Sequence, residues 1–160
     1  MKQWMFFLSS LLIITVDQIS KHIASIRLEL YQSDAVMPML NLTLAHNTGA
    51  AFSFLNGAGA WHHWFFMGFS FAVSVALIVW FIRIPRTERL QSMALSLLLG
   101  GALGNLIDRV RFGYVIDFID VYYKNYHWPI FNIADTAITL GTALLMYALF
   151  LRDTNSKKCS

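Results

Sequence analysis

Residues 64–82 read WFFMGFSFAVSVALIVWFI and contain no charged side chain. A helix of about 20 apolar residues is long enough to cross the hydrocarbon core of a bilayer. The composition agrees, because 57% of the 160 residues are hydrophobic and only 13% are charged, whereas charged residues make up about a quarter of an average soluble domain. The chain is therefore predicted to be an integral membrane protein.

Three further apolar stretches flank this span, at about residues 4–23, 92–109 and 135–151. In the second of these, Gly100 and Gly104 form a small-residue face that lets another helix approach closely. We predict a membrane α-helical fold with four transmembrane helices, organised as a single domain over residues 1–160. A cleaved N-terminal signal peptide is the alternative, but DQISKH at 17–22 stands where a small-residue cleavage site belongs.

The distribution of Lys and Arg predicts that both termini face the cytoplasm. Cytoplasmic loops of membrane proteins carry an excess of basic residues. With both termini inside, the cytoplasmic side has Glu88 and Asp153 as its only acids, and the remaining acids lie outside. The basic residues on that side are Lys2, Arg83, Arg86, Arg89, Arg152, Lys157 and Lys158.

A long insertion at about 28–62 is expected on the outer side. Within it, Leu40, Leu42 and Leu44 alternate with small or polar residues, which is the period of a β-strand. NTG at 47–49 predicts a turn. We therefore expect a small extracytoplasmic β-sheet that rests on the outer leaflet. Aromatic residues in 60–64 and 122–128 are placed at headgroup depth, and the tail 152–160 is predicted to be disordered.

Polar and ionisable residues gather at the outer ends of the spans and in the adjoining loops. Such groups are costly at membrane depth, so by default they mark a functional site facing the interior of the bundle. None of the four spans has a charge near its inner end. The residues are Asp17, Lys21, Asn47, Asn105, Asp108, Arg109, Asp117, Asn132 and Asp135.

Several of these residues also have a purely structural interpretation. Asp17 and Lys21 are four residues apart and can pair on one helix face, as a support rather than as reacting groups. Asp108 and Arg109 follow Asn105 on one helical stripe and are either organising residues or interfacial residues in water. The pair Asn132 and Asp135 can be read as the N-cap of the last helix.

Other polar residues are interpreted without a role in chemistry. Asp120, in DFID, is predicted to be a solvated loop residue. His62 and His63 are assigned to the aromatic belt rather than to a metal site, because no Cys or His cluster at ligand spacing accompanies them. The single cysteine, Cys159, cannot form an internal disulfide.

The remaining candidates for chemistry are two carboxylates, Asp117 and Asp135, since no Ser-His-Asp or Cys-His arrangement is visible. Two carboxyl groups about 3 Å apart share one proton, and their pKa values separate. The ionised group can then activate water while the protonated group binds the carbonyl oxygen of a peptide bond. A position at a helix N-terminus favours Asp135 as the ionised member.

Five motifs, in order along nearly the whole chain, resemble those of bacterial lipoprotein signal peptidase, also called signal peptidase II. They are DQISK (17–21), HNTGAAFSFL (46–55), GGALGNLIDR (100–109), VIDFID (115–120) and FNIADTAI (131–138). Five motifs in one order are far more specific than any single motif.

The resemblance implies an aspartic endopeptidase of the bacterial cytoplasmic (inner) membrane, with its active site near the outer face. It implies that Asp117 and Asp135 are catalytic and that the other residues of the polar set shape the site or hold substrate. The implied partners are membrane lipids and diacylglyceryl-modified prolipoproteins, cut just before the lipidated cysteine. The resemblance also implies inhibition by globomycin, a cradle and lid formed over the substrate by the outer sheet around 28–60, and no cofactor or metal. The formal charge of +3, without a basic cluster, argues against a nucleic-acid partner.

Two other functions are left open by the residues themselves. A proton- or ion-coupled transporter would use the carboxylates as a relay, although no charge lies at mid-membrane depth. A metal-dependent lipid headgroup transferase would use Asp117 and Asp120 as a D-x-x-D magnesium site.

Overall fold

The computed structural model describes residues 4–49, 61–85 and 87–158. Its helices are α1 (Trp4–Arg27), α2 (Trp61–Arg83), α3 (Arg89–Phe112) and α4 (Ile133–Lys158). Each contains a stretch that is long and apolar enough to cross a membrane. The described part of the chain therefore confirms the four predicted spans, with helices that extend several residues beyond the apolar stretches.

Helix α3 forms the centre of the bundle. Of its apolar span, 61% is buried, against 11–22% for the other three helices. Glycines make this packing possible, because a Cβ atom on Gly100 would lie 2.9 Å from the Cβ of Ile13 in α1. A Cβ on Gly101 would meet the carbonyl oxygen of Ala134 in α4. Small residues on α3 thus let α1 and α4 approach on different sides.

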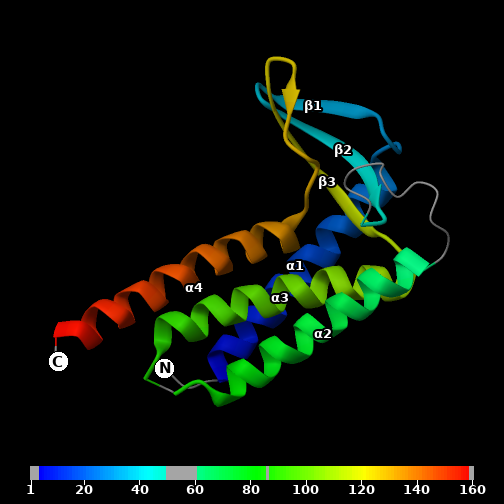
Figure 1. The fold of residues 1–160 in the computed structure, drawn as a ribbon. Coiled ribbons are helices and arrows are strands. Elements are labelled where there is room, and N and C mark those ends of the chain that lie inside the picture. Colours follow the sequence, from blue (N-terminus) through cyan, green and yellow to red (C-terminus); the bar gives the residue numbers. More distant parts are fainter. Residues whose placement is uncertain (1–3, 50–60, 86, 159–160) are drawn as a thin grey trace.

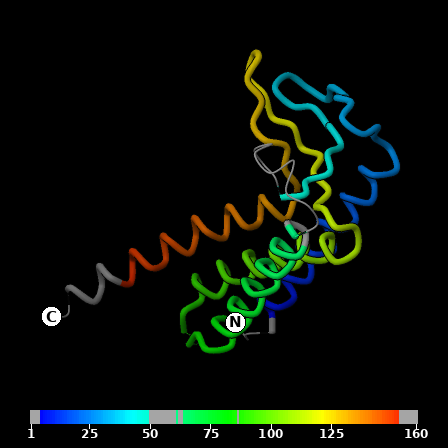
Figure 2. Tube along the Cα trace, turned by 45° about the vertical axis from the view of Figure 1, so that its right-hand side comes forward, coloured from blue at the N-terminus to red at the C-terminus, as the bar shows by residue number. Residues whose placement is uncertain are grey.

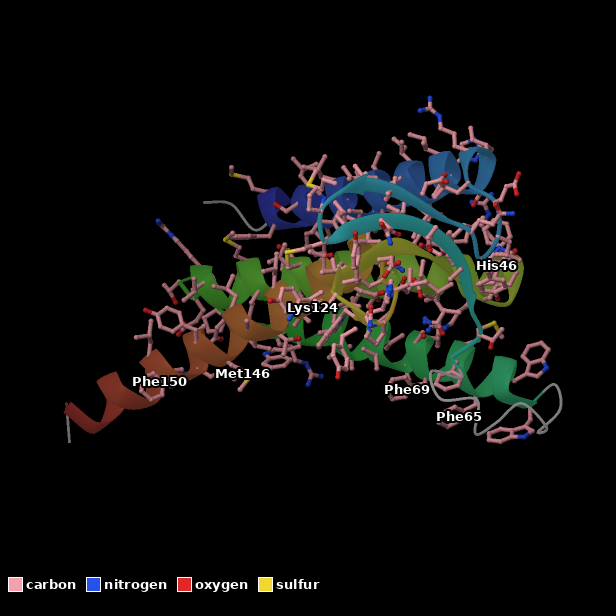
Figure 3. All side chains as sticks on the ribbon, turned by 90° about the horizontal axis from the view of Figure 1, so that it is seen from above. His46, Phe65, Phe69, Lys124, Met146 and Phe150 are labelled. Atoms are coloured by element: carbon pink, nitrogen blue, oxygen red, sulfur yellow. The ribbon has the colours of Figure 1, made fainter. Side chains whose placement is uncertain are left out.

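The other helices present large apolar side chains to their surroundings. Phe65 and Phe69 project from α2, while Met146 and Phe150 lie on the exposed side of α4 (Figure 3). Exposed apolar surface of this extent would be unfavourable in water. In a bilayer it is the surface that contacts lipid.

A four-stranded antiparallel sheet in the order β1-β2-β3-β4 lies at one end of the bundle. In Figures 1 and 2, the start of α1 and the end of α4 lie at the opposite end. The strands are β1 (Ser33–Met37), β2 (Leu40–Asn47), β3 (Val115–Tyr123) and β4 (Tyr126–His127).

Strand β2 confirms the strand predicted from the alternating leucines. The sheet also contains strands that were not predicted. Two of its strands, β3 and β4, follow α3 and lie outside the 28–62 insertion. Residues 115–118 are buried on both faces, so β3 lacks the polar–apolar alternation that reveals a half-exposed strand. The turn after β2 is closed by the amide of Gly49, which donates to Asn47 Oδ1 at 2.8 Å. Residues 50–60 of the insertion lie outside the described part.

The tail was predicted to be disordered over 152–160, whereas α4 continues as a helix to Lys158. Residues 159–160 lie outside the described part. Once a helix is nucleated, each further residue adds a hydrogen bond at little cost. Residues 152–158 contain no Pro or Gly that would stop this extension.

Candidate functional site

Lys21 of α1 connects two helices at the junction of the bundle and the sheet. Its Nζ atom lies 2.8 Å from Asp17 Oδ2 and 2.8 Å from Asp108 Oδ2 of α3. It also donates to Asn105 Oδ1 at 3.0 Å. The residue is only 1% exposed, so these acceptors replace the water that a buried ammonium would lose. The predicted Asp17–Lys21 pair is confirmed, and it is part of a larger network.

Asp17 also binds the start of α4. Its Oδ1 atom accepts a hydrogen bond from the main-chain N–H of Ala134 at 2.9 Å. The first amides of a helix have no partner within the helix, and a carboxylate is favourable there. This contact ties the beginning of α4 to α1.

Asn132 and Asp135 cap α4 reciprocally. The N–H of Asp135 donates to Asn132 Oδ1 at 2.9 Å, and the N–H of Asn132 donates to Asp135 Oδ2 at 3.4 Å. This is the arrangement of a capping box. Asn132 is therefore the N-cap of α4, and Asp135 is its partner in the first turn. The cap does not involve Asp135 Oδ1, which accepts a separate hydrogen bond from Asn105 Nδ2 at 2.7 Å.

Strand β3 places Asp117 beside Asn132, at the start of α4. The Oδ2 atom of Asp117 accepts from Asn47 Nδ2 of β2 at 3.0 Å, and its Oδ1 atom accepts from Asn132 Nδ2 at 2.6 Å. Asn132 thus donates to both acids, from its side chain to Asp117 and from its main chain to Asp135. Two residues that are distant in sequence are joined by one asparagine.

The electrostatic environment of Asp117 favours a proton. Burial raises the pKa of its carboxyl from 3.8 to about 6, and the negative charge of Asp135 acts in the same direction. The hydrogen bonds from Asn47 and Asn132 and the charge of Lys21 oppose this rise in pKa. The negative charge of Asp135 is therefore close enough to disfavour a second negative charge on Asp117.

Asp108 and Arg109 point to different neighbours. Besides Lys21, Asp108 binds the main-chain N–H of Ile116 in β3 at 3.1 Å. Arg109 lines a cavity of about 440 Å³ together with Asn105 and Asp135. Asp108 therefore joins α3 to the sheet, as an organising residue would, while Arg109 brings a positive charge next to Asp135.

Asp135 borders two cavities with mainly apolar walls. The cavity shared with Arg109 is walled by Phe66, Phe69 and Val73 of α2. A second cavity of about 370 Å³ lies between Asp135 and the aromatic residues Trp128 and Phe131. Apolar groups of a ligand in either cavity would therefore lie close to this carboxylate.

Asp120 is not the solvated loop residue that the sequence predicted. It lies in β3 and is only 2% exposed. Asp120 is three positions after Asp117, so the two side chains are on opposite faces of the strand. They contact separate partners, and the proposed D-x-x-D metal site does not form.

Gln18 is a member of the polar network that sequence reasoning missed. Its Nε2 atom donates to Asp108 Oδ1 at 2.9 Å and lies 3.3 Å from Asp17 Oδ2. The sequence feature that could have identified Gln18 is its position three residues before Lys21, within one helical turn. Asn41 and Thr43, which contact Asp120, were also missed, because an alternating strand alone does not reveal which buried acid lies across from it.

The fold and the site define a membrane protein in which two coupled acids lie between four helices and a sheet. Residues 9–151 match the family model described as Signal peptidase (SPase) II. The chain is 52% identical over 141 residues to lipoprotein signal peptidase of Acinetobacter baylyi, covering 88% of this chain and 79% of that protein. It is 47% identical over 150 residues to the enzyme of the same name from Coxiella burnetii, covering 94% and 92%.

A solved structure agrees with this relationship. A bacterial membrane enzyme determined by the in meso method at 2.3 Å resolution has a TM-score of 0.82 and 38% identity, over 96% of this chain and 91% of that one. The chain belongs to the signal peptidase II family. It is a membrane-embedded protease that cleaves the signal peptides of lipoproteins.

Proposed function

We propose that Asp117 and Asp135 are the catalytic dyad of an aspartic endopeptidase. The observation that carries this proposal is their joint attachment to Asn132, which holds Asp117 by its side chain and Asp135 by its main chain. The raised pKa of Asp117, about 6, supports a shared proton in the resting enzyme. The other residues of the network position the dyad through α1, α3 and the start of α4.

The two acids take different parts in the reaction. Asp135 is favoured as the ionised group, because it lies in the first turn of α4, where the helix dipole stabilises negative charge. It removes a proton from the attacking water. Asp117, protonated, donates a hydrogen bond to the scissile carbonyl oxygen, and a proton then passes to the departing amine as the C–N bond breaks.

The substrate is a diacylglyceryl-modified prolipoprotein, cut immediately before the lipidated cysteine. The apolar walls of the two cavities beside Asp135 suit acyl chains and an apolar signal peptide. A membrane helix hides its peptide bonds in internal hydrogen bonds, so cleavage requires a locally unwound segment. The polar network supplies hydrogen-bonding groups for such a segment.

The enzyme lies in the bacterial cytoplasmic membrane with both termini in the cytoplasm and the dyad near the outer face. The excess of Lys and Arg near the termini supports this orientation. Lipids surround the bundle, and the sheet forms the cradle for the substrate. Globomycin inhibits by occupying the space at the dyad.

The test is processing of a lipidated precursor by purified protein in lipid nanodiscs. Asp117→Asn and Asp135→Asn are each expected to lower the cleavage rate by about 10³-fold or more, because each removes a required acid or base. The protein should still insert in membranes. The matched control is Asp34→Asn, which changes an exposed acid of β1 and should leave the rate unchanged.

Two additions to the same assay separate the alternatives. Globomycin should block cleavage by the unmodified protein, whereas EDTA should not. Substantial processing by either dyad variant would contradict the assignment of the catalytic residues, and loss of activity with EDTA would favour a metal-dependent reaction.

A further inference from the structure

The pairing of β2 with β3 changes register beside the dyad. Leu42 lies opposite Ile119, whereas Ala45 lies opposite Asp117. Between these two pairs β2 has two residues, 43 and 44, whereas β3 has only residue 118. Strand β2 therefore carries one extra residue. This is the definition of a β-bulge, a feature that redirects side chains near functional sites.

The bulge decides which face of the sheet receives Asn47. Opposed residues share a face, and side chains alternate along a strand. Because Ala45 opposes Asp117, Asn47 lies on the Asp117 side of the sheet. Without the extra residue, Leu44 would oppose Asp117 and Asn47 would lie on the other side. The bond between Asn47 Nδ2 and Asp117 Oδ2 depends on the bulge.

Asp120 of β3 contacts side chains of β2, at the bulge, and of β4. Its Oδ2 atom accepts from Thr43 Oγ1, inside the bulge, and from Asn41 Nδ2, each at 3.3 Å. Its Oδ1 atom lies 2.8 Å from Nδ1 of His127 in β4. One buried carboxylate thus holds β2 and β4 against β3. Its partners satisfy an acid that is costly to bury.

We propose that Asp120 is a positioning residue for cleavage: it holds the bulge of β2, and the bulge keeps the Asn47 amide on the Asp117 carboxylate. The inference rests on the proposed catalytic role of Asp117. Asp120 contacts no reacting group, since its side chain lies on the opposite face of β3. It acts through Thr43 and Asn47.

This arrangement has a consequence for the pH dependence of cleavage. The bond from Asn47 stabilises the ionised form of Asp117, so its loss raises the pKa of Asp117 further. The other charged groups that act on Asp117 are Asp135 of α4, Lys21 of α1 and Arg109 of α3. None of the three is among the partners of Asp120, which are Asn41, Thr43 and His127. Loss of Asp120 or of Asn47 should therefore move the alkaline limb of the rate profile in the same direction, to higher pH.

The decisive experiment is a double-mutant cycle with Asp120→Ala, Asn47→Ala and both changes together, measured by kcat on the lipidated precursor. Each single change is expected to lower kcat by about tenfold to a hundredfold, the factor for losing a hydrogen bond to a charged group. The double variant should be no slower than the slower single variant, and all three should share the shifted pH profile. KM should change little.

A purely structural role for Asp120 gives a different result. The two effects on kcat would then multiply, to about a hundredfold to ten-thousandfold, and Asp120→Ala would keep the pH profile of the unmodified enzyme. That outcome, or an unchanged kcat in Asp120→Ala, would overturn the proposal. Failure of the proposed function would instead appear as cleavage by Asp117→Asn, so the two failures are distinguishable.

Two further variants keep the proposal testable if Asp120→Ala does not fold, and one of them tests whether a conservative change restores activity. Thr43→Val removes the hydroxyl with little change in volume and should couple to Asn47→Ala in the same way; multiplied effects in this cycle would also overturn the proposal. Asp120→Asn keeps an oxygen for Thr43 and an amide for His127, and should recover kcat to within about threefold of the unmodified enzyme. The matched control is Val121→Thr, on the same strand beyond the bulge, which should have no effect.

Discussion

Lys21 has two carboxylate partners and almost no contact with solvent. Its removal would leave Asp17 and Asp108 buried without their shared cation. Breaking a buried ion pair from one side typically costs about 3–5 kcal/mol. We therefore expect Lys21→Met to lower the free energy of unfolding by that amount, measured by denaturant titration in detergent. Arg27→Gln, at an exposed site on the same helix, should change it by less than about 0.5 kcal/mol.

The raised pKa of Asp117 predicts a pH dependence of stability. Between about pH 4 and pH 6 the folded protein holds a proton on Asp117 that the unfolded chain has released. Stability therefore falls as pH rises through this window. Asp117→Asn removes this dependence, so its stability relative to the unmodified protein should increase between pH 4 and pH 7, by about 1–3 kcal/mol.

The measurement is the thermal midpoint of both proteins across this pH range. A constant difference between the two proteins would contradict a raised pKa of Asp117 in the folded state. Lower activity together with higher stability at neutral pH is the expected signature of a residue kept for chemistry.

At the scale of secondary-structure elements, α3 and α4 are held together by close contact at Gly101. A methyl group at this position would meet the carbonyl oxygen of Ala134, which belongs to the backbone and cannot rotate away. Gly101→Ala should therefore cost about 1–3 kcal/mol and slow cleavage, because it displaces the turn that carries Asp135. Stability and cleavage rate would be measured on the same preparation.

Gly68 provides the control for this prediction. It lies in the middle of α2, and a Cβ atom there would have no neighbour within 4 Å. Gly68→Ala should be neutral or stabilising by up to about 1 kcal/mol, because alanine favours the helix. Equal effects of the two substitutions would show that helix propensity, and not contact with α4, determines the result.

The elements differ in how well sequence alone predicts them. The four helices were predictable because predominantly apolar stretches of this length are typical of membrane spans and rare in soluble domains. Strand β3 was not, since residues 115–118 are buried on both faces and show no alternation. That omission accounts for the error at Asp120, whose burial depends on Asn41 and His127 from neighbouring strands. The two acids that we propose as the dyad stood out in the sequence because ionisable groups at membrane depth are rare.

The whole molecule has two unlike ends. The sheet and the carboxylate network lie at one end, and the start of α1 and the end of α4 lie at the other (Figure 1). In the topology predicted from the sequence, seven of the twelve Lys and Arg residues lie on the same side of the membrane as the termini. Since basic residues are retained in the cytoplasm, the sheet should face outward.

The natural Cys159 makes this orientation testable with a membrane-impermeant maleimide. It is the single cysteine of the chain and lies next to the C-terminus, so it should be labelled only after intact cells are permeabilised. In a Cys159→Ser background, Tyr126→Cys places a thiol at a site that is 81% exposed in β4, and this thiol should be labelled in intact cells. The reverse pattern would place the dyad on the cytoplasmic side, where a precursor cleaved after export could not reach it.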